Sequence, residues 1–274
     1  MKTWRFTGLL AIALLIVSPA ARADVTEEDT FERTVALGGG GQVEVETTNG
    51  SIRVETWDRS EVQVVARKKA RDHDAAAARD LLERIEVQVQ ELGDKVRVTA
   101  RLPRSGWFGG SSASVSFVLT VPSDAELTAT SSNGSIKVRD LGGRARLETD
   151  NGSIEADGVR GALRAHSDNG RIEALDVHGA IEAKTTNGAV KAEIATADLA
   201  EDVSLETTNG SVELRLDPGV AASLYARTDN GSVSSDFPGG IQDRRKKTLE
   251  LDLNGGGPRI RLESTNGSIR VRER

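Results

Sequence analysis

The six residues TDNGSI at positions 149–154 are one copy of a phrase that recurs along most of the chain. The next copies read SDNGRI at 167–172 and TTNGAV at 185–190, so their asparagines are 18 residues apart. Later steps are 22, 21 and 36 residues (187 to 209, 209 to 230, 230 to 266). Such repetition is typical of proteins that stack one structural unit per copy. The predicted turn residues are Asn49, Gly50, Asn133, Gly134, Asn151, Gly152, Asn169, Gly170, Asn187, Gly188, Asn209, Gly210, Asn230, Gly231, Asn266 and Gly267.

Apolar residues alternate with polar ones on both sides of each Asn-Gly pair. Around Asn169, for example, Leu163 and Ala165 come before the turn and Ile172 and Ala174 come after it. A period of two indicates strands with one buried face. Because every copy has the same inward pattern, we expect like to stack on like in parallel coils about 4.8 Å apart. The predicted fold is all-β, a single-stranded parallel β-helix (β-solenoid); an antiparallel sandwich or barrel is the alternative.

The turn phrase itself suggests a structural role. Asn and Gly tolerate positive φ, which we expect a sharp coil corner to require. The Thr or Ser two residues before each Asn, such as Thr149, shares the parity of the inward positions, so its hydroxyl is expected to bond backbone groups at the bend. The 36-residue step equals two periods of 18, which predicts a degenerate copy at about 248–253.

The chain divides into three parts. Lys2 and Arg5 precede an apolar run at 9–17, and ARA at 21–23 follows it, so residues 1–23 are predicted to be a cleaved signal peptide. Residues 24–274 form one predicted domain, with regular coils at 123–274. Residues 58–122 depart from the repeat and are expected to cap or decorate the solenoid, with strands at 61–67, 85–90, 95–102 and 114–121 and a short helix at 74–84.

Composition excludes several kinds of chemistry. The 274 residues contain no cysteine and 3 histidines, which rules out disulfides and thiolate chemistry and leaves little for a histidine metal cluster. The 36 basic and 42 acidic residues give a net charge of −6 with both signs interspersed, which argues against a nucleic-acid partner. We therefore expect no cofactor and no metal.

Stacked carboxylates are the best hint of an enzyme. Asp150 and Asp168 occupy the same offset on successive copies, with Arg171 expected nearby as a counter-charge. Two more copies carry Thr186 and Thr208 there, so the column is discontinuous and no catalytic constellation accompanies it. We predict no catalytic residues; the alternative is a polysaccharide-active β-helix lyase or hydrolase that uses these two carboxylates.

Two other features concern the surface. Three residues before the Asn, an outward column reads Glu148, His166, Lys184, Glu206, Arg227, so unlike charges are expected on adjacent coils from Lys184 onward. Trp107 and Phe108 lie between glycines in a chain with few aromatics. They are candidates for contact with a partner, and the alternative is that they cover the end of the solenoid.

With its serial T-x-N-G-S-I phrases, the chain resembles the DUF4097 family of adhesin-like proteins, which is related to the head-GIN domain proteins. The resemblance extends from about Phe31 to Val271 and implies a right-handed β-helix in the cell envelope, with no catalytic residues to carry over. We therefore predict an exported, non-enzymatic scaffold, periplasmic or extracellular, with no transmembrane segment after signal cleavage. Its expected partner is an envelope protein or a glycan, and not nucleic acid.

Overall fold

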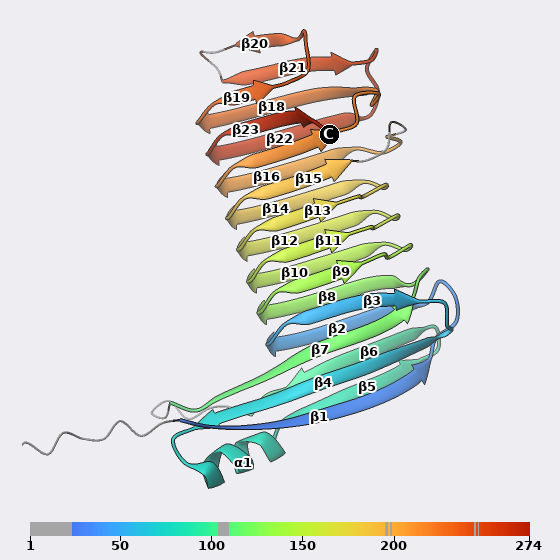
Figure 1. The fold of residues 1–274 in the computed structure, drawn as a ribbon, viewed down its shortest axis with the longest axis vertical. Helices are drawn as coiled ribbons and strands as arrows, with labels where there is room; N and C mark the ends of the chain where they lie inside the picture. The colour runs from blue at the N-terminus through green and yellow to red at the C-terminus, as the bar shows by residue number, and fades with distance from the viewer. Residues whose placement is uncertain (1–23, 104–109, 195–196, 198, 244, 246) are drawn as a thin grey trace, which may run out of the picture.

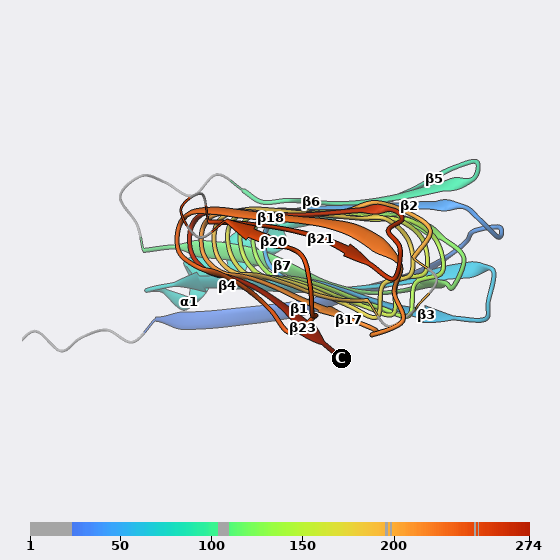
Figure 2. The same cartoon turned by 90° about the horizontal axis from the view of Figure 1, so that it is seen from above.

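The strands on either side of each Asn-Gly corner belong to two different sheets that face each other (Figures 1 and 2). These sheets are seen in a computed structural model that describes residues 24–274, except 104–109, 195–196, 198, 244 and 246. The described part is mostly β, with one α-helix, α1 (Ala75–Glu83). The two sheets are long and their central strands are parallel, so the described chain forms a solenoid-like stack.

Sheet A holds the strands that follow the corners, and sheet B holds those that precede them. In spatial order, sheet A consists of β1 (Val25–Ala36), β4 (Glu61–Asp72), β7 (Ser112–Pro122), β3 (Ile52–Trp57), β9 (Ile136–Arg139), β11 (Ile154–Asp157), β13 (Ile172–Leu175), β15 (Val190–Ile194), β17 (Val212–Leu216), β23 (Ile269–Glu273) and β19 (Val233–Ser235). Sheet B consists of β20 (Ile241–Asp243), β21 (Thr248–Leu253), β18 (Ala222–Asn230), β22 (Arg259–Asn266), β16 (Val203–Asn209), β14 (Ile181–Asn187), β12 (Leu163–Asn169), β10 (Ala145–Asn151), β8 (Glu126–Asn133), β2 (Gln42–Asn49), β6 (Lys95–Arg101) and β5 (Glu86–Leu92).

The coils stack in register, like on like. Asn151 lies beside Asn133 on one side and Asn169 on the other, and Leu147 lies beside Ala165. The two strands that flank a corner pair with neighbouring coils and not with each other. The predicted parallel stacking is therefore confirmed, and the antiparallel alternative is wrong for these coils.

The hydrophobic core fills the space between the two sheets. The alternating apolar residues face inward as predicted; Leu163, Ala165, Ile172 and Ala174 are each at most 2% exposed. Most of the core consists of Val, Ile, Leu and Ala, and Phe117 is the one aromatic among the largest fully buried side chains described. Residues of this size fit two sheets stacked face to face and give every coil nearly the same cross-section.

The region 58–122 builds the N-terminal end of the stack. Strands β6 and β7 form a coil next to β2 and β3, and β1, β4 and β5 add antiparallel strands outside it. Helix α1 lies within the predicted range, and the Asp74 carboxylate caps it by accepting bonds from the Ala76 and Ala77 amides. At this end Arg33 joins the two sheets, donating to the Val89 carbonyl at 3.3 Å.

The C-terminal end differs from the prediction. Residues 248–253 form β21, which pairs antiparallel with β18 and is not a degenerate coil. The final coil, β22 and β23, lies between the coil of β16 and β17 and that of β18 and β19 (Figure 1). The period could not reveal this order, because every coil presents the same bonding surface to its neighbours.

Candidate functional site

The corner asparagines form a continuous ladder along the stack. In each step the Nδ2 of one Asn donates to the Oδ1 of the Asn on the next coil, at 2.9 to 3.0 Å. Because each amide donates to one neighbour and accepts from another, the ladder fixes the stacking register. The donor and acceptor pairs are Asn133 to Asn49, Asn151 to Asn133, Asn169 to Asn151, Asn187 to Asn169, Asn209 to Asn187, Asn266 to Asn209 and Asn230 to Asn266.

The corner glycines are required by close backbone approach rather than by positive φ. Of the eight, Gly50 has φ +138°, and the other seven lie outside the left-handed region, as do all eight asparagines. The expectation of a positive-φ corner is therefore wrong. A Cβ on Gly170 would lie 1.8 Å from the carbonyl oxygen of Gly152 on the adjacent coil. Stacking at this distance leaves no room for any side chain.

The hydroxyl two residues before each Asn is buried and bonds across to the next coil. Ser167 Oγ donates to the Gly152 carbonyl at 2.9 Å, and Thr185 Oγ1 donates to the Gly170 carbonyl at 2.9 Å. The predicted inward orientation and backbone bond are confirmed. Because these hydroxyls are engaged inside the stack, the corner builds the scaffold, and candidate binding groups lie on the outward faces.

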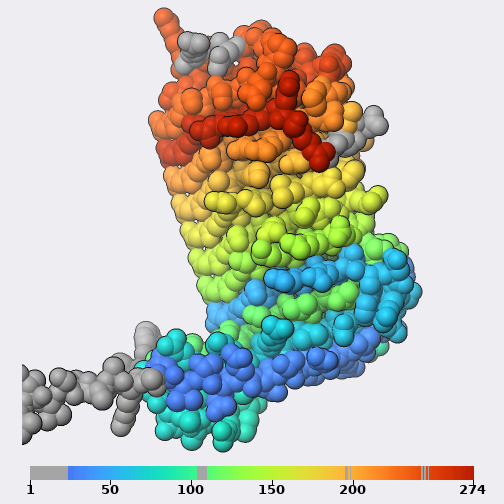
Figure 3. Space-filling view, in the orientation of Figure 1, coloured from blue at the N-terminus to red at the C-terminus, as the bar shows by residue number. Residues whose placement is uncertain are grey.

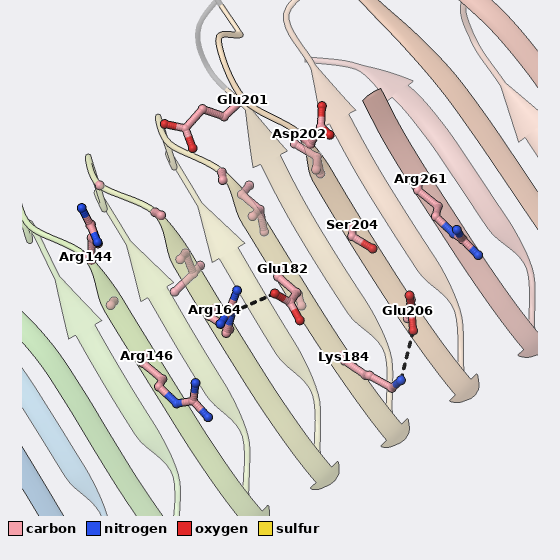
Figure 4. Close-up of a pocket in the computed structure, with 18 of the residues that line it drawn as sticks. Arg144, Arg146, Arg164, Glu182, Lys184, Glu201, Asp202, Ser204, Glu206 and Arg261 are labelled. Atoms are coloured by element: carbon pink, nitrogen blue, oxygen red, sulfur yellow. Dashed lines mark ion pairs between the residues drawn. The ribbon is translucent and has the colours of Figure 1, made fainter. Parts of the chain in front are cut away.

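A shallow trough of about 1040 Å³ runs across the outward face of sheet B. Its floor is low because Ala162 and Ala180 directly precede β12 and β14, at the position where neighbouring coils carry Arg144 or Asp202. Long charged side chains surround this floor (Figure 4). The charged residues of the trough are Glu126, Arg144, Arg146, Arg164, Glu182, Lys184, Glu201, Asp202, Glu206, Arg259 and Arg261.

The charges of the trough are sorted along the stack. Arg144, Arg146 and Arg164 lie on the coils of β10 and β12, whereas Glu201 and Asp202 lie at the start of the β16 coil (Figure 4). Three coil steps separate Arg144 from Asp202, a distance of about 14 Å along the stack. The trough therefore presents a band of arginines and a band of acidic residues at fixed spacing. Glu126 lies on the coil before the arginine band, and Arg259 and Arg261 lie on the β22 coil beyond the acidic band.

Ion pairs link neighbouring coils within the trough. Arg164 Nε lies 2.7 Å from Glu182 Oε2, and Lys184 Nζ lies 3.2 Å from Glu206 Oε2. The side chains of Arg164 and Glu182 are 62% and 58% exposed, so each pair contributes little to stability but remains open to a ligand. The Lys184–Glu206 pair confirms the first step of the predicted charge column.

The rest of that column differs from the prediction. Glu206 lies beside Glu263, and Glu263 lies beside Arg227, because the last coil is inserted between the two. Two like charges therefore neighbour each other. Arg261 compensates, since its guanidinium bonds Glu263 at 2.8 Å; this bond, with the charges of Glu263 and Glu206, raises the pKa of Arg261. Asp229 similarly raises the pKa of Arg227 through a hydrogen bond.

The predicted carboxylate pair lies on the exposed corner, outside the trough. Asp150 and Asp168 are on adjacent coils, each directly before a ladder asparagine. Asp168 pairs with His166 at 3.4 Å, and Arg171 pairs with Glu173 at 3.4 Å, so the expected Arg171 counter-charge is wrong. Within the described part of the chain, no three His, Asp or Glu residues are grouped so that they could hold a metal ion.

The other predicted contact residues are Trp107 and Phe108, which lie outside the described residues. The sequence prediction missed the trough arginines, although a signal existed: Arg146, Arg164 and Glu182 share the offset five residues before the Asn. Among the helices that the structure describes, none has the length and apolar character needed to cross a membrane.

The chain was compared with known proteins. It is similar to solved structures of a "putative cell adhesion protein" from Clostridium sporogenes (11% identity, 90% of this chain and 100% of that one, TM-score 0.40) and a "putative adhesin" from Bacteroides fragilis (11%, 90% and 97%, 0.42). A third is a "putative lipid binding protein" from Parabacteroides distasonis (10%, 90% and 97%, 0.31). No curated protein matches the chain. The model of the family described as Toastrack DUF4097 matches residues 126–272, more than half of the chain including seven of its eight corners, and the chain therefore belongs to that family.

Proposed function

We propose that the chain is an exported, non-enzymatic scaffold that binds a partner in the cell envelope through the trough on sheet B, in the manner of an adhesin. The observation that carries this proposal is the banded arrangement of charge in the trough, with Arg144, Arg146 and Arg164 on one side of a low floor and Glu201 and Asp202 on the other. A surface with both signs in a fixed arrangement favours one orientation of a charged partner over others.

The rigidity of the trough supports binding. Its residues project from parallel strands whose register is fixed by the ladder of asparagines and by buried hydroxyls such as Ser167 and Thr185. A preorganised surface loses little conformational entropy when a partner binds. The partner that fits is an envelope protein or a glycan that carries anionic groups opposite the β10 and β12 coils and cationic groups opposite the β16 coil.

Export rests on the sequence. The basic start, the apolar run at 9–17 and the small residues at 21–23 favour a cleaved signal peptide, and the absence of cysteine is compatible with an oxidising compartment. We accordingly place the protein in the periplasm or outside the cell. N-terminal sequencing of the protein recovered from cells would test this directly, since a mature chain beginning at Asp24 is expected.

Binding can be tested with two matched double variants. Arg146→Glu with Arg164→Glu reverses the charge of two residues in the arginine band of the trough, where these side chains are 52% and 62% exposed. Arg139→Glu with Arg171→Glu makes the same change of charge outside the trough, at the end of β9 and directly before β13, where the arginines are 59% and 64% exposed. Sedimentation with envelope material from the source bacterium should show a loss of about tenfold or more in affinity for the first variant only.

The outcomes of this experiment distinguish binding through the trough from attraction by net charge alone. Equal loss in both variants would indicate attraction by net charge alone, without use of the trough. Retained binding in both variants would contradict the proposal. Circular dichroism and the melting temperature of each variant must match those of the unaltered chain, which is expected because all four arginines lie at the surface.

A further inference from the structure

The last coil of the sequence is inserted in the stack rather than added to its end. The Nδ2 of Asn266 donates to Asn209 at 2.9 Å, and the Nδ2 of Asn230 donates to Asn266 at 3.0 Å. Strands β22 and β23 thus fill a slot between the coil of β16 and β17 and the coil of β18 and β19 (Figure 3, dark red band). The coil is held on both faces by residues that precede it in the sequence.

The bonds that hold this coil are those of any repeat coil. Ser264 Oγ donates to the Gly210 carbonyl at 2.9 Å, and Thr228 Oγ1 donates to the Gly267 carbonyl at 2.7 Å. They join the inserted coil to its two neighbours, so the same bonds form whichever copy of the chain supplies the coil. Ile260, Leu262, Ile269 and Val271 fill the core at this level and are buried.

Some outward charges of the slot match those of the inserted coil, although Glu206 lies beside Glu263 and Arg215 lies beside Arg272. Arg270 on β23 lies beside Glu213 on β17, and Arg261 on β22 is close enough to Glu206 on β16 for that charge to raise its pKa. The backbone amide of Arg259 donates to Asp202 Oδ1 at 2.8 Å at the entry of the slot. These favourable contacts add to the ladder in holding the coil, and they form equally with a coil from a second copy of the chain.

A glycine-rich connection joins the inserted coil to β21. Residues 254–258 read NGGGP, and Asn254, Gly255 and Gly256 all have positive φ. A Cβ on Gly255 would meet no heavy atom within 4 Å. The glycines tolerate the new backbone angles that a hinge in an exchanged element requires, although a change of direction here breaks the bonds of 2.9 and 2.8 Å from the Asn254 side-chain amide to the Pro218 and Val220 carbonyls.

The coils on either side of the slot match each other. Both coils place an asparagine beside Asn266 and a threonine beside Ser264. The asparagines are Asn209 and Asn230, and the threonines are Thr207 and Thr228. When the inserted coil leaves, these two coils can therefore pair directly, which limits the exposed strand edge and lowers the cost of opening.

We propose that the slot between the β16–β17 and β18–β19 coils accepts residues 259–273 from a second copy of the chain, so that two chains exchange their last coil and form a dimer. The exchanged segment carries Arg259 and Arg261, which line one end of the trough, but the exchange does not depend on the proposed function. The driving force is mass action, because the bonds of the closed and exchanged forms are the same and only chain concentration separates them.

Three single-cysteine variants test the exchange, since the natural chain contains no cysteine. Glu263 lies beside Glu206 on one side and beside Arg227 on the other, at outward positions. Neighbours in a parallel sheet are about 4.8 Å apart, within the range a disulfide spans. The variants are Glu206→Cys, Arg227→Cys and Glu263→Cys, and one member of each mixed pair carries a tag that separates hetero-dimers by mass.

Each pair is mixed at high concentration in mild denaturant, diluted and oxidised. Exchange predicts hetero-dimers from Glu206→Cys with Glu263→Cys and from Arg227→Cys with Glu263→Cys, but not from Glu206→Cys with Arg227→Cys. Hetero-dimers from all three pairs would mean random collision, and none would mean that the coil stays with its own chain; either result overturns the proposal. A chain carrying both Glu206→Cys and Glu263→Cys should form an internal disulfide, which verifies the folded register.

Discussion

The side-chain amide of Asn266 donates a hydrogen bond of 2.9 Å to that of Asn209, which lies 57 residues earlier in the sequence. Asn230, which comes between them in the sequence, takes the next place outward in the ladder. The stack is therefore complete only when the last coil has entered. Residues 222–253 reach their final place in the stack only when this later coil has entered, and we expect this end to reach its native order last.

The inward register is the first property to test. Leu205 is fully buried between the sheets, so Leu205→Asp places a charge without a partner in the core and should unfold the protein. Glu206, the next residue, points outward and pairs with Lys184. Glu206→Lys should cost less than about 1 kcal/mol in urea unfolding. Equal destabilisation by the two substitutions would contradict the assigned faces.

The requirement for glycine at the corner is the second property to test. Gly170→Ala places a methyl group 1.8 Å from the Gly152 carbonyl oxygen, so the coils must separate locally. We expect a loss of about 3 kcal/mol in the free energy of unfolding, measured by urea titration. Gly38→Ala is the control, because a Cβ there meets nothing within 4 Å and the φ of Gly38 lies outside the left-handed region. A small effect at Gly170 would mean that the stacking distance is wrong.

This glycine also marks what the sequence can and cannot predict. The spacing of the phrase and the alternation around Asn169 were enough to predict parallel strands, the buried face and the role of the Ser167 hydroxyl, because these depend on local period. The reason for Gly170 could not be found in the same way, since it depends on the distance to Gly152 on another coil.

The order of the coils and the trough were hidden for a similar reason. Glu206 neighbours Glu263 and not Arg227 because a later segment is inserted, and sequence order carries no information on insertion between equivalent coils. The trough exists because Ala162 and Ala180 are small where Arg144 and Asp202 are large. That contrast is visible in the sequence only after the coils have been aligned on one face.

Stability should fall in acid through two lysine-bonded glutamates. Hydrogen bonds from Lys95 and Lys137 hold the pKa values of Glu44 and Glu155 below the ordinary value of 4.5. A carboxyl group with a lowered folded pKa stabilises the protein fully above the unfolded pKa, and this contribution is lost as the pH falls through the folded pKa. The double variant Glu44→Gln with Glu155→Gln should therefore be less stable at pH 7, by about 1 kcal/mol or less per site. This difference should shrink as the pH falls below 4.5 and vanish once the pH is below the lowered pKa values of the folded protein.

Urea unfolding of both proteins between pH 3 and pH 7 measures this dependence. Replacing the lysines, Lys95→Met with Lys137→Met, should reduce the pH dependence but leave the part that comes from Arg97 and Arg139, which also pair with the two glutamates. A difference between wild type and the glutamine variant that persists unchanged at the lowest pH would show that the two ion pairs are not its source.

The last prediction concerns the carboxylates at the corner. Asp150 and Asp168 lie on adjacent coils at the exposed surface, where two charges about 5 Å apart repel by only ~1 kcal/mol at the dielectric of water. His166 lies 3.4 Å from Asp168. The next coil carries Thr186 at this offset, so no third carboxylate adds to the repulsion between the two aspartates. Calcium should therefore leave the melting temperature unchanged, and the mature chain should not cleave acidic polysaccharides. A calcium-dependent rise in melting temperature, or turnover abolished by Asp150→Ala with Asp168→Ala, would instead support the polysaccharide-active alternative. The matched control is Asp229→Ala, at the same offset on the β18 coil, which should alter neither the melting temperature nor any turnover.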